Sequence, residues 1–176
     1  LGEAGGTSLL FLIPAYLLAV ILHEAGHAFT VKAFGREVPR AGIGWYWFGP
    51  VAFVDTTDMW MAGRWPRIAV SLAGPYANML LAGAAALGAW LVPDQGLAAS
   101  LWQFSLVSYL MVLLNLNPLL EYDGYYVLMD ALDRSNLRPD ALSWIGRNLP
   151  SAFRQPGEIA SHWLELTYGI ASLLYV

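Results

Sequence analysis

Long uncharged apolar runs constrain the fold of this chain more than any other feature. One run covers residues 8–22 and continues to Val31 except for one polar cluster; the others cover residues 68–92 and 97–120. About 20 apolar residues cross the roughly 30 Å of hydrocarbon in a bilayer as a helix. Only 12% of the residues are charged, about half the usual share in a soluble domain. The sequence therefore predicts an all-α integral membrane protein with three transmembrane helices.

The rest of the chain divides around these helices. We expect a core over residues 1–132, a polar cytoplasmic linker with one short helix over 133–160, and the start of a truncated fourth membrane segment over 161–176. Within the core we expect spans at about 8–34, 66–92 and 97–120, the last continuing to 132. Because the chain begins with Leu1 and ends in an apolar run, we expect it to be part of a longer protein.

The segment "GIGWYWFGPVAFVD", residues 42–55, lies between the first two spans. It contains two runs rich in aromatic residues and valine on either side of the turn signal Gly49-Pro50, which predicts a small β-hairpin. An aromatic anchor at the membrane interface is the alternative interpretation.

The positions of the nine lysines and arginines predict the orientation in the membrane. Five lie from Lys32, at the end of the first span, to Arg67, at the start of the second, and the other four follow the third span. With three spans, both of these segments fall on one face of the bilayer. The positive-inside rule makes that face cytoplasmic and places the N-terminus outside.

The first apolar run contains the polar cluster His23-Glu24-Ala25-Gly26-His27. Histidines at positions i and i+4 share one face of a helix, where both imidazoles can bind one Zn²⁺. Glu24 lies beside that face and suits a general base that acts on a zinc-bound water. Ionisable groups inside a span are costly and usually functional, although a hydrogen-bonded His–Glu packing contact is the alternative.

A catalytic zinc needs a third protein ligand, and the chain has no cysteine to provide it. Pro118 breaks or kinks the end of the third span, and two carboxylates, Glu121 and Asp123, follow it. We favour Asp123 as the ligand because Gly124 after it permits a tight turn. The remaining histidine, His162, lies in the polar tail and is a weaker candidate.

These motifs occur in an order that resembles the site-2 protease family of intramembrane zinc metalloproteases. The family's pattern is matched by HEAGH in the first span, by Gly74-Pro75 and Asn78 in the second, and by Asn115-x-x-Pro118-x-x-x-x-Asp123-Gly124 in the third. The stretch "NPLLEYDGYYVL" more closely resembles a bacterial branch of peptide zinc metalloproteases that is often joined to membrane or export modules. The sequence departs from better-known members because it lacks a second proline between Pro118 and Asp123.

The resemblance implies one Zn²⁺ per chain and assigns a role to each of six residues. These are His23, His27 and Asp123 as zinc ligands, Glu24 as general base, and Asn78 or Asn115 to position the substrate or stabilise the oxyanion. We then expect hydrolysis of peptide bonds in membrane-spanning or membrane-associated substrates, in a bacterial inner membrane, with the active site towards the cytoplasm. We expect the lipid bilayer and export machinery as partners, and no nucleic acid.

A non-proteolytic zinc-binding subunit of a peptide export or maturation assembly is the alternative. The intact Glu24 argues against it, because a structural zinc site has no use for a base. A di-iron membrane oxidase or desaturase needs many histidines, and the chain has three.

Overall fold

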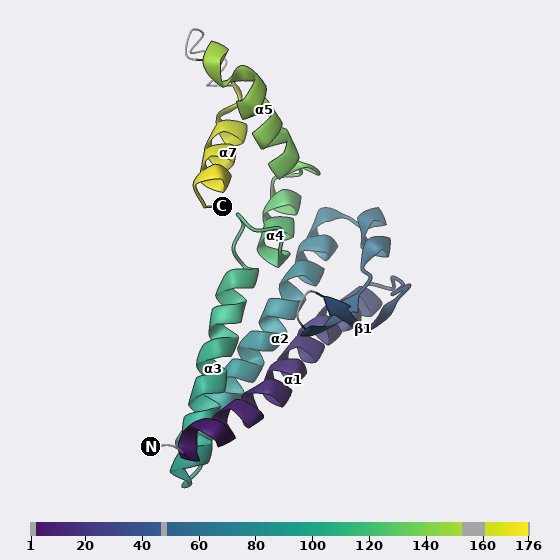
Figure 1. Cartoon of the computed structure of the whole chain (residues 1–176). Helices are drawn as coiled ribbons and strands as arrows, with labels where there is room; N and C mark the ends of the chain where they lie inside the picture. Colours follow the sequence, from purple (N-terminus) through teal and green to yellow (C-terminus); the bar gives the residue numbers. More distant parts are fainter. Residues whose placement is uncertain (1–2, 47–48, 153–160, 176) are drawn as a thin grey trace.

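The computed structural model describes residues 3–46, 49–152 and 161–175 (Figure 1). Their α-helices are α1 (Glu3–Ala33), α2 (Arg64–Leu91), α3 (Gln95–Asn115), α4 (Asp123–Ala131), α5 (Leu137–Ala152) and α7 (Trp163–Tyr175). Strands β1 (Ala41–Tyr46) and β2 (Gly49–Val54) and the 3-10 helix η1 (Thr57–Met61) lie between α1 and α2. The described residues are therefore mostly helical, with one small sheet, as the sequence predicts.

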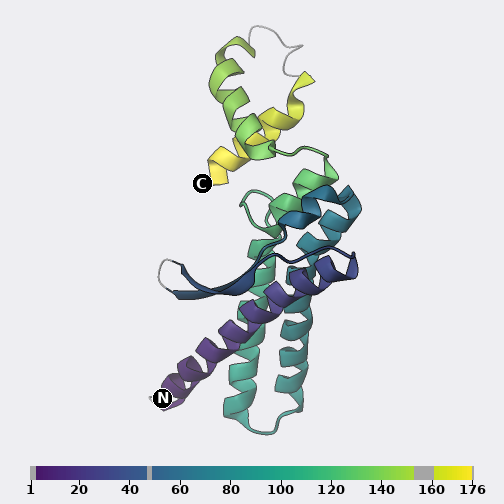
Figure 2. The same ribbon diagram turned by 90° about the vertical axis from the view of Figure 1, so that its right-hand side faces the viewer.

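The three long helices pack against one another, with α2 in contact with both α1 and α3. Helices α2 and α3 run side by side in opposite directions, and α1 crosses them obliquely (Figure 2). Small residues allow this close approach: Ala19 of α1 and Ala85 of α2 are buried together with Phe104 of α3. The hydroxyl of Ser105 also donates a hydrogen bond to the carbonyl of Ala82, at 2.9 Å.

Two of the described helices, α2 and α3, are long and apolar enough to cross a membrane. They coincide with the spans predicted at 66–92 and 97–120. The connection between these helices is short, because α2 ends at Leu91 and α3 begins at Gln95. The carboxylate of Asp94 caps α3 by accepting a hydrogen bond from the backbone N–H of Leu97, at 2.7 Å. Helix α1 runs unbroken through the predicted first span, but its crossing of the membrane and that of residues 161–176 stay predictions.

The third span does not continue to residue 132 as one helix. Helix α3 ends at Asn115, a loop follows, and α4 begins at Asp123, which agrees with the break expected at Pro118. The loop folds back so tightly that a Cβ added to Gly124 would overlap the carbonyl of Leu116. Asp123 therefore begins a new helix that is packed against the end of α3.

Helix α5 lies in the segment expected to be a polar linker, and its 16 residues exceed the one short helix predicted there. Helices α5 and α7 pack together and against α4 (Figure 1). Their shared buried cluster consists of Tyr125, Met129, Leu137, Ala141 and Tyr168. Residues 153–160 of the predicted linker lie outside the described residues.

The predicted hairpin is present, with β1 and β2 paired antiparallel from Ala41 opposite Val54 to Tyr46 opposite Gly49. The turn predicted at Gly49-Pro50 is wrong, because these residues begin β2 and Pro50 is paired with Trp45. Proline is tolerated in an edge strand, where its missing N–H does not interrupt a ladder. Strand β2 contacts α1. This contact brings the hairpin beside residues 23–27, the helical turn of α1 that carries the HEAGH motif (the HEAGH turn).

Candidate metal centre

His23 and His27 lie one turn apart on α1, and both are buried. Their Nε2 atoms are 3.1 Å apart. Asp123, at the start of α4, places Oδ2 3.1 Å from His23 Nε2 and Oδ1 3.4 Å from His27 Nε2. The structure therefore brings together the three residues predicted as metal ligands, from two helices almost a hundred positions apart in the chain.

The spacing of these atoms suits a tetrahedral zinc ion. Zinc bonds of about 2.0–2.1 Å in a tetrahedron place neighbouring ligand atoms roughly 3.3 Å apart. Oδ2 of Asp123 is buried and makes no well-aligned hydrogen bond, although Nε2 of His23 lies 3.1 Å away, as expected of two atoms that face the same metal ion. On α2, a Cβ added to Gly74 would lie 2.6 Å from Nε2 of His23 and closer still to Nε2 of His27. The bare glycine thus leaves space in front of both imidazoles, and these residues fit zinc.

Groups on α2 hold the other ring nitrogens of the two histidines. Nδ1 of His27 lies 2.7 Å from the carbonyl of Val70, which accepts its proton and leaves Nε2 free to bind a metal. Nδ1 of His23 lies 3.3 Å from the amide nitrogen of Asn78. The amide oxygen of Asn78 is buried without a partner. A half-turn of the amide, which exchanges its oxygen and nitrogen, lets this oxygen accept the His23 N–H.

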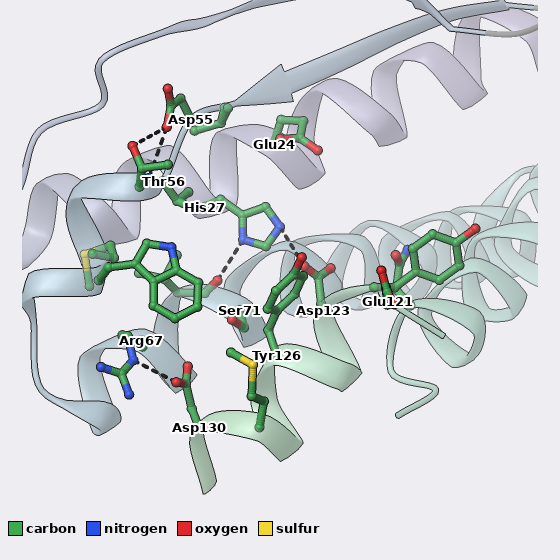
Figure 3. Close-up of a pocket in the computed structure, with 18 of the residues that line it drawn as sticks. Glu24, His27, Asp55, Thr56, Arg67, Ser71, Glu121, Asp123, Tyr126 and Asp130 are labelled. Carbon is green, nitrogen blue, oxygen red and sulfur yellow. Dashed lines mark hydrogen bonds and ion pairs between the residues drawn. The ribbon is translucent and has the colours of Figure 1, made fainter. Parts of the chain in front are cut away.

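A cavity of about 510 Å³ opens in front of the metal site, within the usual size range of ligand pockets. The two histidines, Glu24, Asn115 and Asp123 line it, and most of its lining is visible in Figure 3. Glu24 is half-buried and lines the same cavity as the candidate ligands, as a general base must. Asn78 is fully buried behind His23 and does not line the cavity.

The two weaker ligand candidates lie outside the group of ligand atoms, although Glu121 lines the same cavity. The carboxylate of Glu121 is mostly exposed and lies 3.6 Å from Nη1 of Arg138. The ring of His162 stacks on Trp144, with 5.3 Å between the ring centroids. Neither belongs to the group of metal-ligating atoms around His23 and His27.

Sequence reasoning missed an ion pair between α2 and α4. Nε of Arg67 donates to Oδ1 of Asp130 at 2.7 Å, and Nη1 donates to the carbonyl of Ala62 at 3.1 Å. Asp130 is 5% exposed, and both charged residues line the cavity (Figure 3). The sequence alone does not single out this pair, because Arg64 lies beside Arg67 and Asp133 beside Asp130 at the ends of the two apolar segments.

Comparison with known proteins adds evidence that is independent of this geometry. The sequence profile of peptidase family M50 matches residues 11–94, which include HEAGH and Asn78 but not Asp123. The chain is 26% identical over 167 residues to the "Putative peptide zinc metalloprotease protein YydH" of Bacillus subtilis (strain 168). That match covers 93% of this chain but 57% of the relative's length. No solved structure matches the chain.

Proposed function

We propose that the chain is the core of a zinc metalloprotease. The matches to peptidase family M50 and to a peptide zinc metalloprotease, together with the resemblance to the site-2 protease family, support this proposal. The substrates of this protease are membrane-embedded or membrane-associated peptides, and it hydrolyses their peptide bonds. The observation that carries the proposal is the convergence of His23, His27 and Asp123, whose ligand atoms, one from each residue, all lie within 4.8 Å of one another. Glu24, the base that hydrolysis requires, lines the same cavity.

The reaction divides between the metal ion and the side chains. When bound, zinc supplies Lewis acidity that lowers the pKa of a water towards about 7 and polarises a carbonyl. Glu24 accepts the proton of the attacking water and then delivers it to the leaving amine. Val70 and Asn78 orient the imidazoles from behind, so Asn115 is the asparagine placed to contact the substrate from the cavity wall.

The β-hairpin offers a place for an extended substrate. Strand β2 packs beside α1, and its last residue, Val54, lines the cavity together with Glu24. An extended peptide that adds to the free edge of β2 would therefore be led towards the metal site. A photo-cross-linker at Val51 or Trp45 should capture substrate that is trapped on the inactive Glu24→Gln protein. Absence of cross-links from both positions would remove this role.

The alternative, a zinc-binding subunit without protease activity, predicts no function for Glu24. Association with export machinery is compatible with either function. The chain spans 57% of the length of its relative, so it does not include all the segments through which such a protein could bind a partner. In the proposed orientation, the protein lies in a bacterial inner membrane and its cavity is towards the cytoplasmic face, where the basic residues lie.

The decisive experiment replaces Glu24 with glutamine in the full chain, purified in detergent. Because glutamine keeps the size but cannot accept the proton, zinc content should stay unchanged while peptide hydrolysis falls about 10²–10⁴-fold. Glu37→Gln, the same chemical change at an exposed position just beyond α1, should leave both unchanged. Hydrolysis that survives Glu24→Gln would refute the protease mechanism.

A further inference from the structure

The loop that brings Asp123 to the histidines is held by a helix late in the chain. The hydroxyl of Tyr168, in α7, donates a hydrogen bond to the carbonyl of Pro118 at 2.8 Å. Pro118 lies in the loop between α3 and α4, five positions before Asp123. Tyr168 is 6% exposed, and its hydrogen bond to the carbonyl of Pro118 is partly buried.

Short-range turns pair part of this loop's backbone, such as the N–H of Leu120 with the carbonyl of Asn117 at 3.4 Å, and side chains supply further partners for a segment that is not helical. An unpaired carbonyl is costly in a buried setting, and non-helical backbone at membrane depth is tolerated only where protein or a water-filled cavity covers it. From inside the loop, Oδ1 of Asn117 accepts the N–H of Leu119 at 2.9 Å. Tyr168 supplies the partner from outside for Pro118.

The ring of Tyr168 also holds the segment on the other side of Asp123. It packs in the buried cluster with Tyr125 and Met129 of α4, and the rings of Tyr125 and Tyr168 have centroids 6.5 Å apart. The hydroxyl of Tyr125 accepts the backbone N–H of Arg138 at 3.3 Å. Tyr168 thus contacts the chain both before and after Asp123.

We propose that Tyr168 is a positioning residue for the third metal ligand. This inference rests on the proposed zinc site. His23 and His27 share one helix, so their separation is fixed by α1 alone. The carboxylate of Asp123 comes from a loop end, and the Tyr168–Pro118 hydrogen bond fixes its distance from the imidazoles. The pair of helices α5 and α7 therefore contributes to metal affinity without touching the metal.

The test is Tyr168→Phe in the full chain, which keeps the ring in its cluster and removes only the hydroxyl. Zinc affinity, measured by competition with a chelator, should fall about tenfold, at the low end of what outer-shell partners of metal ligands contribute. Hydrogen exchange of the metal-free protein should become faster in residues 117–126. Tyr175→Phe, the same change at a 48% exposed position of α7, should alter neither measurement.

The outcomes separate this inference from the proposed function. Wild-type protein that binds no zinc, or binds it equally well after His23→Ala, would overturn the zinc site and with it this inference. Zinc binding that requires His23 but is equally tight in Tyr168→Phe and wild type would overturn the role of Tyr168 alone. A general loss of helix content in Tyr168→Phe would also count against it, because the hydroxyl would then stabilise the whole fold instead of the loop.

Discussion

At the scale of single residues, Gly74 and the two imidazoles occupy neighbouring positions across the contact between α1 and α2. A methyl group at position 74 would lie within 2.6 Å of Nε2 of His23, where a metal ion must bind. Alanine is otherwise about 1 kcal/mol better than glycine inside a helix. Gly74→Ala should therefore raise helix propensity but block metal binding.

We therefore predict that Gly74→Ala loses most of its bound zinc while its helix content is retained. Gly83→Ala is the matched control, because a Cβ there would be in ordinary contact, 3.5 Å from the hydroxyl of Tyr109. Elemental analysis and circular dichroism of the two purified variants provide the measurements. Full zinc occupancy in Gly74→Ala would mean that the metal does not bind in front of this glycine.

The two carboxylates after Pro118 provide the next prediction. Asp123 lies against both histidines, whereas Glu121 faces Arg138. Asp123→Ala should lose most bound zinc and all hydrolysis, and Glu121→Ala should keep the metal and some activity. Metal analysis of both variants decides the matter, and the reverse pattern would identify Glu121 as the ligand.

The degree to which the site could be predicted depends on how local each contact is. The i, i+4 spacing of His23 and His27 brings their rings together through helix periodicity alone. Placing Asp123 needed the break at Pro118 and a family resemblance. The carbonyl of Val70, which is 43 positions from its partner His27, leaves no signal in the sequence, because any residue has a carbonyl and only packing selects this one.

At the scale of helices and strands, apolar length predicts α2 and α3 well. Helix α5 is longer than the short helix expected in residues 133–160, a polar segment whose prolines favour a linker. Pro139 lies in the first turn of α5, however, where its missing N–H costs no hydrogen bond. The hairpin was predicted by its strand composition, but its turn was not, since Gly49-Pro50 fits an edge strand as well as a turn.

The ion pair between Arg67 and Asp130 joins two of these elements, α2 and α4. Their side chains are 21% and 6% exposed, so Arg67→Met leaves a buried carboxylate without its partner. Removing one partner of a buried pair typically costs about 3–5 kcal/mol of stability, whereas an apolar pair in its place is often tolerated. We predict a large fall in melting temperature for Arg67→Met and recovery of most of it in Arg67→Met/Asp130→Leu.

The control for this prediction is Arg40→Met. Arg40 also pairs with an aspartate, Asp55, but its side chain is 81% exposed, and exposed pairs contribute little. Its melting temperature should stay close to that of the wild type. Equal effects of Arg67→Met and Arg40→Met would mean that the pair between α2 and α4 does not stabilise their contact.

At the scale of the whole molecule, the described helices have two distinct ends. The start of α1 and the connection between α2 and α3 lie together at one end, and α4 and α5 lie at the other (Figure 1). The HEAGH turn lies in the half of α1 nearer the second end. Of the nine lysines and arginines, five lie between the HEAGH turn and the start of α2, up to Arg67, and four lie after the third span. By the positive-inside rule, this distribution predicts that the second end faces the cytoplasm.

Single cysteines in these 176 residues test this orientation, because this part of the sequence has none of its own. Gln95, beside the connection between α2 and α3, and Glu37 and Ser135, near the other end, are all exposed positions. In intact cells, a membrane-impermeant thiol reagent should label Gln95→Cys and should reach Glu37→Cys and Ser135→Cys only after the membrane is opened. The charge difference between the ends makes this orientation favourable, since basic segments are retained on the cytoplasmic side. Labelling of Glu37→Cys in intact cells, with Gln95→Cys protected, would place the metal centre towards the outside and reverse the topology.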